Sequence, residues 1–296
     1  MPFVQLSIDL GAQDPSAAED ACFQRGALSV TLADAADDPV LEPAPGTTPL
    51  WPRVRLTALF PGGADGPALV TGLARSLTLP AAGLDWELVE DRAWEREWLK
   101  DFRPMRFGRR LWICPGGQSA PDPDARVLEL DPGLAFGTGT HPTTASCLDW
   151  LDAADLAGRT VLDYGCGSGV LALAALRLGA AAACAVDIDP QALLAARQNA
   201  ARNRLGSQLE VMATDELRDG EWDVVLANIL AGPLVELAPR LAAHTRPGGS
   251  IVLAGMLESQ AEGVAATYRP WFDMHRFSNR DGWTVLSGRK RIPAAG

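Results

Sequence analysis

Over the first ninety residues, hydrophobic and polar positions alternate in four short runs, separated by two segments with helical spacing. A period of two places alternate side chains on one face of a strand, and a period near 3.6 marks one face of a helix. The pattern predicts strands at Phe3–Leu10, Ala27–Leu32, Arg53–Phe60 and Leu84–Glu90, and helices at Asp14–Gly26 and Pro67–Leu77. The order β-α-β-β-α-β is typical of a small ferredoxin-like α+β domain.

From residue 107 onward, predicted strands alternate with predicted helices. The strands are Arg109–Cys114, Val127–Leu130, Thr160–Tyr164, Ala182–Asp187, Leu209–Ala213, Asp223–Ala227 and Ser250–Ala254. The helices are Thr143–Leu156, Val170–Leu178, Pro190–Asn203, Gly232–Ala243 and Leu257–Tyr268. This alternation indicates an α/β fold, with a doubly wound, mostly parallel sheet that helices cover on both faces. The last segments, Trp271–Phe277 and Trp283–Arg289, predict a hairpin that adds an antiparallel strand at the sheet edge.

A charged segment separates these two patterns. Residues Asp91–Phe102 (DRAWEREWLKDF) have helical spacing, and Trp94 and Trp98 fall on the same helix face. The segment is either a linker helix docked through its tryptophans or a hinge between domains. We therefore expect an N-terminal domain over residues 1–90, a linker helix over 91–106 and a second domain over 107–296.

Composition narrows the function and the compartment. Of the 296 residues, 37 are acidic and 26 are basic, which gives a net charge of −11. This charge argues against direct binding of nucleic acid, which needs a basic surface, and it leaves room for a basic protein partner. The five scattered cysteines form neither a disulfide framework nor a zinc motif. With no secretory signal pattern and no long apolar run, we expect a cytoplasmic monomer without a membrane segment.

The strongest chemical signal is a glycine loop between a strand and a helix. In Val161–Val170 (VLDYGCGSGV), the strand ends at Asp163 and Tyr164, and Gly165, Gly167 and Gly169 follow at alternate positions. Such glycines allow a tight turn and a close approach of the backbone to a ligand. Asp187 ends the next strand, 22 residues after Gly165, where a carboxylate can accept both hydroxyls of a ribose.

Two cofactor classes use this arrangement in a Rossmann-like sheet. A dinucleotide needs G-x-G-x-x-G to hold its pyrophosphate at the helix N-terminus. The sequence D-x-G-x-G-x-G favours S-adenosylmethionine instead, with Asp163 close to the ammonium group of the ligand. The remaining alternative is a tight turn that binds nothing.

Two further segments carry candidate site residues. Asn228 follows the apolar strand 224–227, where its amide can face a ligand or cap the next helix. Upstream, the loop 131–142 is rich in glycine and threonine and leads into a helix, which is typical of a flap over a ligand. Thr143 or Thr144 could offer a hydroxyl there. His141 has no second ligand at a suitable spacing, so we expect no metal site.

These segments together resemble a known family. DPGLAFGTGTHPTT, DYGCGSGVLALAAL, VDIDPQA and ANILAGPL look like the ribosomal protein L-eleven methyltransferase family (PrmA), and the likeness covers nearly the whole chain. The resemblance implies methyl transfer from S-adenosylmethionine to lysine ε-amino and N-terminal α-amino groups of this large-subunit ribosomal protein. It also implies an N-terminal domain that recognises the substrate and is joined flexibly to the catalytic domain. By motif, Thr144, Gly165, Asp187 and Asn228 would contact the cofactor, together with Gly167 of the loop.

The residues themselves are consistent with an amine as the acceptor. Asn228 is followed by Ile229–Pro233 (ILAGP) and not by the Asn-Pro-Pro-Tyr type of motif that grips planar bases. No dedicated proton acceptor is evident, so no catalytic residue is assigned. A nucleic acid methyltransferase, a nicotinamide-dependent oxidoreductase and a binding protein that kept the fold are the alternative functions.

Overall fold

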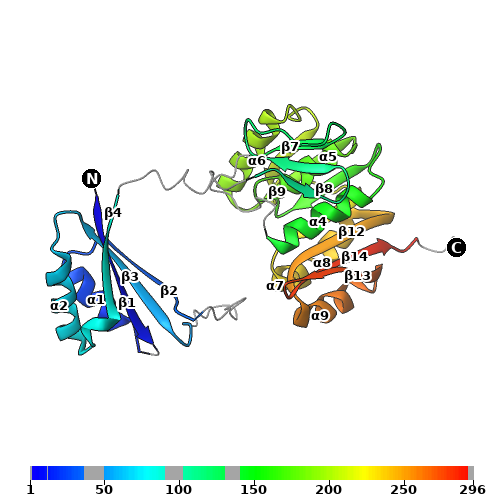
Figure 1. Ribbon diagram of the computed structural model, residues 1–296. Helices are drawn as coiled ribbons and strands as arrows, with labels where there is room; N and C mark the ends of the chain where they lie inside the picture. The colour runs from blue at the N-terminus through cyan, green and yellow to red at the C-terminus, as the bar shows by residue number, and fades with distance from the viewer. Residues whose placement is uncertain (1, 12, 37–49, 91–102, 131–140, 293–296) are drawn as a thin grey trace. The chain divides into compact units, whose positions relative to one another are not determined.

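The structure is a computed structural model that describes residues 2–11, 13–36, 50–90, 103–130 and 141–292 (Figure 1). The chain divides into two compact units, Met1–Trp94 and Glu95–Gly296. Residues 91–102 of the predicted linker helix (91–106) and residues 131–140 of the predicted flap lie outside the described residues. The helix prediction is wrong at its end, because residues 105 and 106 belong to the strand β5 Met105–Phe107.

The first unit is a four-stranded antiparallel sheet with two helices. Its elements are β1 Phe3–Gly11, α1 Ser16–Gln24, β2 Ser29–Asp34, β3 Val54–Pro61, α2 Gly66–Leu77, a 3₁₀ turn at Ala81–Gly83 and β4 Leu84–Val89. The strand order is β2-β3-β1-β4, with every pair antiparallel. Along β1 every second side chain is buried, including Leu6 and Ile8, and these pack with Phe60 and Leu73 in one core. The ferredoxin-like fold predicted for this unit is confirmed.

The second unit is built on a seven-stranded sheet of order β10-β9-β8-β11-β12-β14-β13. Strands β8 to β12 are parallel, and β14 and β13 are antiparallel additions at one edge. The bounds are β8 Thr160–Tyr164, β9 Ala182–Asp187, β10 Leu209–Ala213, β11 Trp222–Asn228, β12 Thr245–Leu257, β13 Phe272–Arg280 and β14 Trp283–Lys290. This is the predicted doubly wound Rossmann-like sheet with its C-terminal hairpin.

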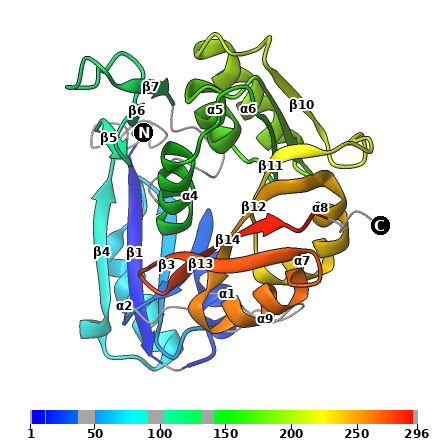
Figure 2. The same ribbon diagram turned by 90° about the vertical axis from the view of Figure 1, so that its right-hand side faces the viewer.

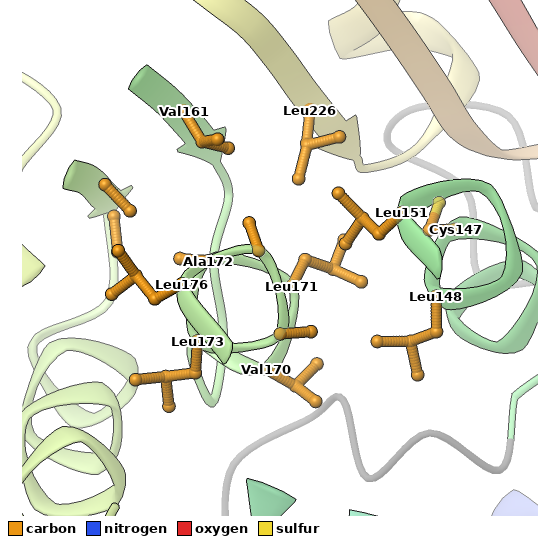
Figure 3. Close-up of a cluster of buried hydrophobic side chains, with 14 of the residues drawn as sticks. Cys147, Leu148, Leu151, Val161, Val170, Leu171, Ala172, Leu173, Leu176 and Leu226 are labelled. Atoms are coloured by element: carbon orange, nitrogen blue, oxygen red, sulfur yellow. The ribbon is translucent and has the colours of Figure 1, made fainter. Parts of the chain in front are cut away.

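Helices cover both faces of this sheet. Helices α4 Pro142–Ala153, α5 Val170–Arg177 and α6 Pro190–Arg202 pack on one face, and α7 Ala231–Glu236, α8 Ala238–His244 and α9 Glu258–Tyr268 on the other (Figure 2). Figure 3 shows the first of the two resulting cores, where leucines of α4 and α5 meet Val161 and Leu226 of the sheet.

The prediction of a single helix over Gly232–Ala243 is wrong, because the structure has two short helices there. The break falls at Leu237, which ends α7 and precedes the first residue of α8. Pro239 lies at the second position of α8 and lacks a backbone N–H. Proline is tolerated in the first turn of a helix but not in its interior, so the chain begins a new helix at this point.

A second, smaller sheet holds α4 in place. It consists of β5 Met105–Phe107, β6 Leu111–Cys114 and β7 Arg126–Glu129. In the turn after β5, the N–H of Gly108 donates to Asp149 at 2.6 Å and the N–H of Arg109 donates to Asp152 at 2.6 Å. Both carboxylates belong to α4. The turn thus fixes α4, whose first turn contacts the end of β11 in the main sheet.

The main sheet has one point where consecutive connections run in opposite directions. From β8 the chain continues to β9 on one side, and β11 lies on the other side. In open α/β sheets, ligands bind beyond the carboxyl ends of the strands at such a switch point. No helix in the described part of the chain is long and apolar enough to cross a membrane.

Candidate functional site

A pocket of about 550 Å³ lies at the carboxyl ends of β8, β9 and β11. It contains three of the five residues that the sequence predicts for the cofactor, namely Gly165, Gly167 and Asp187. The other lining residues are Tyr164, Ile188, Asp189, Gln191, Ala192, Thr214, Ile229, Leu230, Pro233 and Leu237. The pocket therefore joins one polar wall from the glycine loop and β9 to one apolar wall from the segment after β11.

The glycine loop requires residues without side chains. Gly165 has φ +77°, and a Cβ atom built on it would lie 2.3 Å from Cγ2 of Ile229. Gly169, at the start of α5, has φ +75°, and its Cβ would lie 3.0 Å from Cβ of Ala196. Positive φ angles strain other residues, and a Cβ at Gly165 would force Ile229 to move, whereas one at Gly169 would press closely on Ala196. The loop backbone can therefore come close to a ligand in the pocket.

Asp187 is held in a fixed orientation at the pocket wall. Its Oδ2 accepts the N–H of Gly167 at 2.9 Å, and its Oδ1 accepts the N–H of Asp189 at 3.0 Å. Each carboxylate oxygen has a second lone pair, so both can still accept a hydrogen bond from a hydroxyl. A vicinal diol such as that of a ribose matches two such acceptors.

Apolar side chains at the pocket were not predicted from the sequence. Ile188 is 84% exposed and Leu230 is 51% exposed, although both are large and apolar. Exposed apolar side chains beside a pocket are typical of a surface that packs against an apolar or aromatic ligand. Ile188 directly follows Asp187, the polar end of β9, and Leu230 follows Ile229 just after the end of β11. This position next to a strand end was the sequence signal that could have indicated both residues.

Arg240 contacts two residues of the pocket lining. The guanidinium group of Arg240 lies 5.7 Å from the ring centroid of Tyr164 and donates to the carbonyl of Thr214 at 2.6 Å. Tyr164 and Thr214 both line the pocket. Arg240 therefore ties the end of β8 to the segment after β10.

The two remaining predicted residues, Thr144 and Asn228, contact each other. The Nδ2 atom of Asn228 donates to Oγ1 of Thr144 at 3.1 Å, and Thr144 is buried near the start of α4. The alternative in which Asn228 caps α7 is wrong, because the N-cap residue is Leu230. Neither residue lines the pocket, but Ile229, which directly follows Asn228 in the sequence, does.

Asp163 differs from its predicted role beside the pocket. Its side chain is fully buried, and Oδ2 accepts the N–H of Ala172 at 3.1 Å, so the carboxyl caps α5 from the strand below. Among the described residues none donates to its Oδ1. Burial raises the pKa of this carboxyl to about 7. Asp163 thus lies under the glycine loop and is absent from the pocket lining.

The cysteines take no part in the pocket lining. All five are buried and unpaired, and burial raises the pKa of each thiol. Within the described ranges, no three metal-ligating side chains lie close enough together to hold an ion.

The pocket fits an adenosyl group better than a dinucleotide. The cradle at Gly165 admits close backbone contact, Asp187 presents paired acceptors, and Ile188 and Leu230 supply apolar surface. The next glycine after Gly167 is Gly169, which packs against Ala196. The loop therefore lacks the G-x-G-x-x-G spacing that a pyrophosphate site uses.

Known proteins resemble the chain over nearly its whole length. The family model described as "Ribosomal protein L11 methyltransferase (PrmA)" matches residues 2–291. Proteins named ribosomal protein L11 methyltransferase from Pseudomonas aeruginosa (strain LESB58) and Methylococcus capsulatus (strain Bath) are each 52% identical. The matches cover 98% and 97% of this chain and 99% of each relative. The crystal structure of a ribosomal protein L11 methylase from Lactobacillus delbrueckii subsp. bulgaricus matches with a TM-score of 0.59 and 30% identity, over 64% of this chain and 100% of that one.

Replacing Asp187 tests the ribose contact. We expect Asp187→Ala to weaken binding of S-adenosylmethionine by about 1–3 kcal/mol, the range for a lost set of charge-assisted hydrogen bonds. Isothermal titration calorimetry measures this change. The matched control is Glu210→Ala on the adjacent strand β10, which should bind normally. Unchanged affinity in a folded Asp187→Ala protein would show that the carboxylate does not hold the cofactor.

Asp163 should make stability depend on pH. Because its pKa is about 7 in the folded protein and about 4 in an unfolded chain, the folded state binds the extra proton between these values. Its contribution to the free energy of unfolding therefore falls as pH rises from about 4 to about 7, by at most about 1.4 kcal/mol per pH unit. Asp163→Asn cannot ionise, so its stability relative to the wild type should increase from pH 5 to pH 8. Urea unfolding at both pH values measures this difference, and an equal difference at both would contradict the assignment.

Proposed function

The chain belongs to the ribosomal protein L11 methyltransferase (PrmA) family, and we propose that it methylates ribosomal protein L11 with S-adenosylmethionine as the methyl donor. The acceptors in this proposal are lysine ε-amino groups and the N-terminal α-amino group. The observation that carries it is the pairing of Asn228 with Thr144 beside a pocket that fits an adenosyl group. Identity of 52% over nearly the full length of relatives with that name supports the substrate.

The proposed roles in cofactor binding follow from the contacts. Asp187 accepts hydrogen bonds from the two ribose hydroxyls. The backbone at Gly165 and Gly167 passes close to the ligand. Ile188 and Leu230 pack against the adenine. Asn228 and Thr144 contact the cofactor on the side of β11. When bound, S-adenosylmethionine supplies an electrophilic methyl group on a sulfonium. The protein's own contribution is to orient this group and to exclude water.

An amine acceptor must be neutral when it reacts, and the apolar surroundings favour this state. With a reference pKa of about 10.4, a lysine ammonium loses its proton at pH 7 at a cost of roughly 4.6 kcal/mol. Ile229 follows Asn228 and offers the amine an apolar environment, which lowers this cost because burial disfavours the charged form. The amide oxygen of Asn228 can accept a hydrogen bond from the neutral amine. Positioning and desolvation therefore carry the catalysis in this proposal.

We assign recognition of the substrate protein to the first unit. It has its own core, and the lining of the cofactor pocket contains none of its residues. Its two helices pack on the same face of the sheet, and the opposite face carries a shallow pocket of about 510 Å³. Asp9, Asp85 and Glu87 line this pocket beside Arg55. Carboxylates that predominate on such a surface attract a basic partner and speed the encounter with it.

Mass spectrometry tests the activity and its acceptors together. Purified L11 should gain multiples of a methyl group when incubated with the protein and S-adenosylmethionine, and fragmentation should place them on lysines and on the N-terminus. The Asp187→Ala protein serves as the low-activity control. Methylation of ribosomal RNA instead of L11 would refute the proposed substrate.

Removing the first unit should separate recognition from cofactor binding. A chain that begins at Glu90 should bind S-adenosylmethionine with near-normal affinity, because the pocket residues all remain. Its kcat/KM on L11 should fall by about 10² or more, since a docked partner presents its amines at a high effective concentration. Calorimetry and a methylation assay on both proteins measure the two quantities. Equal kcat/KM values would show that the first unit does not recognise the substrate.

A further inference from the structure

The turn after β10 lines the cofactor pocket but has little support from the sheet. β10 is an edge strand of the seven-stranded sheet and pairs with β9. Its last residue, Ala213, precedes Thr214 of the pocket lining. The N–H of Glu216 donates to the carbonyl of Ala213 at 3.0 Å, and the side chain of Glu216 accepts the N–H of Ala213 at 2.9 Å. These bonds close the turn on itself, so its attachment to the rest of the pocket depends on other contacts.

Arg240 provides such a contact from outside the turn. It belongs to α8, on the face of the sheet where Tyr164 packs. Its guanidinium group donates to the carbonyl of Thr214 at 2.6 Å and lies 5.7 Å from the ring centroid of Tyr164. In the strand order β10-β9-β8, these two partners lie on opposite sides of β9, which ends at Asp187. Arg240 therefore connects the two strand ends that flank the carboxylate proposed to hold the ribose.

An arginine side chain is suited to both contacts at once. A guanidinium group offers a flat face to an aromatic ring and N–H groups at its edge to an acceptor. Arg240 is exposed, and within the described ranges no carboxylate lies at ion-pair distance from it. Its partners are thus a ring and a carbonyl of the pocket lining, and neither an ion pair nor burial accounts for its position.

We propose that Arg240 is a positioning residue of the cofactor pocket, which holds the Tyr164 ring and the turn after β10 at the separation that receives the purine of the cofactor. Leu237, three residues before Arg240, lines the same pocket, so the start of α8 borders it directly. The inference rests on the proposed function for the identity of the cofactor. It adds a residue outside the pocket lining to those that determine cofactor affinity.

A positioning role and a purely electrostatic role predict different results. S-adenosylmethionine carries a positive sulfonium, whereas S-adenosylhomocysteine, which lacks the methyl group, has a neutral sulfur. Repulsion from a guanidinium group would weaken binding of the first ligand only, so removal of Arg240 would then tighten it. Loss of a brace at the purine end weakens both ligands by the same factor. It also weakens methylthioadenosine, which keeps the adenosyl group and lacks the amino acid.

Calorimetry with these three ligands tests the role of Arg240. Arg240→Ala should raise the Kd of each ligand by about fivefold or more, because a cation–π contact and a charge-assisted hydrogen bond are both lost. The KM for S-adenosylmethionine should rise by the same factor, while kcat on L11 changes by less than about twofold. Arg240→Lys keeps the charge and a donor but not the flat fork, and should recover part of the affinity.

Arg197 provides the matched control. It is an exposed arginine of α6 that donates to the carbonyl of Val211 in β10 at 2.9 Å, three residues before Thr214. Neither Arg197 nor Val211 lines the cofactor pocket. Arg197→Ala therefore removes a similar contact from the same strand, and should bind all three ligands as the wild type does.

A double-mutant cycle connects the effect to Tyr164. Tyr164→Leu removes the ring, and its effect on the Kd should be smaller in Arg240→Ala than in the wild type, because the contact is already lost there. Tyr164→Phe keeps the π face and should keep most of the affinity. If the factors for Arg240→Ala and Tyr164→Leu simply multiply in the double variant, the two residues do not act together and the proposed brace is refuted.

The remaining outcomes separate this inference from the proposed function. Wild-type affinity for all three ligands in Arg240→Ala would overturn the inference and leave the proposed function in place. Tighter binding of S-adenosylmethionine alone, or an equal loss of affinity in Arg197→Ala, would overturn it as well. Melting temperatures without ligand show whether each variant folds, and Arg240→Met, which keeps the stem and neither contact, replaces an Arg240→Ala protein that does not. A wild type that binds none of the three ligands would refute both proposals.

Discussion

The site depends on the close approach of two turns, one after β8 and one after β11. These strands are neighbours, and their register pairs Tyr164 with Ala227, so the residues that follow, Gly165 and Asn228, emerge side by side. Ile229 then crosses against Gly165, at a distance that leaves no room for a side chain on the glycine. A shift of one residue in this register would turn every side chain of β11 to the other face and would remove Asn228 from its partner. The parallel pairing of two apolar strands therefore sets the geometry of the polar site.

Helix α4 forms the side of the site that the parallel strands do not provide. Its first turn carries Thr144, and its later turns are held by Asp152 against the turn after β5 and by Trp150 against β14. Arg280 of the hairpin also contacts Asp149 at 2.6 Å. The hairpin and the small sheet thus do more than extend the fold, because both fix the helix that brings a hydroxyl to Asn228.

Most of the architecture could be predicted because periodicity reports burial directly. The strand with the glycine loop was predicted at its observed bounds, Thr160–Tyr164, since an apolar run followed by glycines has few alternatives. The three-residue strand Met105–Phe107 was missed, because so short a segment has no measurable period. The break at Leu237 was missed because the apolar positions of α7 and α8 continue one helical pattern across it.

Predictions for the site succeeded where a motif fixes the backbone and failed where tertiary packing decides. Gly165 and Asp187 line one pocket because the turn and the strand end place them there. The direction in which Asp163 points depends on α5 above it, which a linear motif does not encode. The contact of Arg240 with Tyr164 joins positions 76 residues apart, and one sequence gives no sign of such a pair.

The separate cores have a consequence for how the protein loses its structure. The cluster around Leu6 and Phe60 shares no residue with the two clusters on the faces of the larger sheet. Cooperative unfolding requires that the loss of one contact weakens the others, and this coupling acts through a shared core. The first core therefore shares no side chain through which it could stabilise the larger unit directly, and a substitution that disrupts it changes no residue of the cofactor pocket.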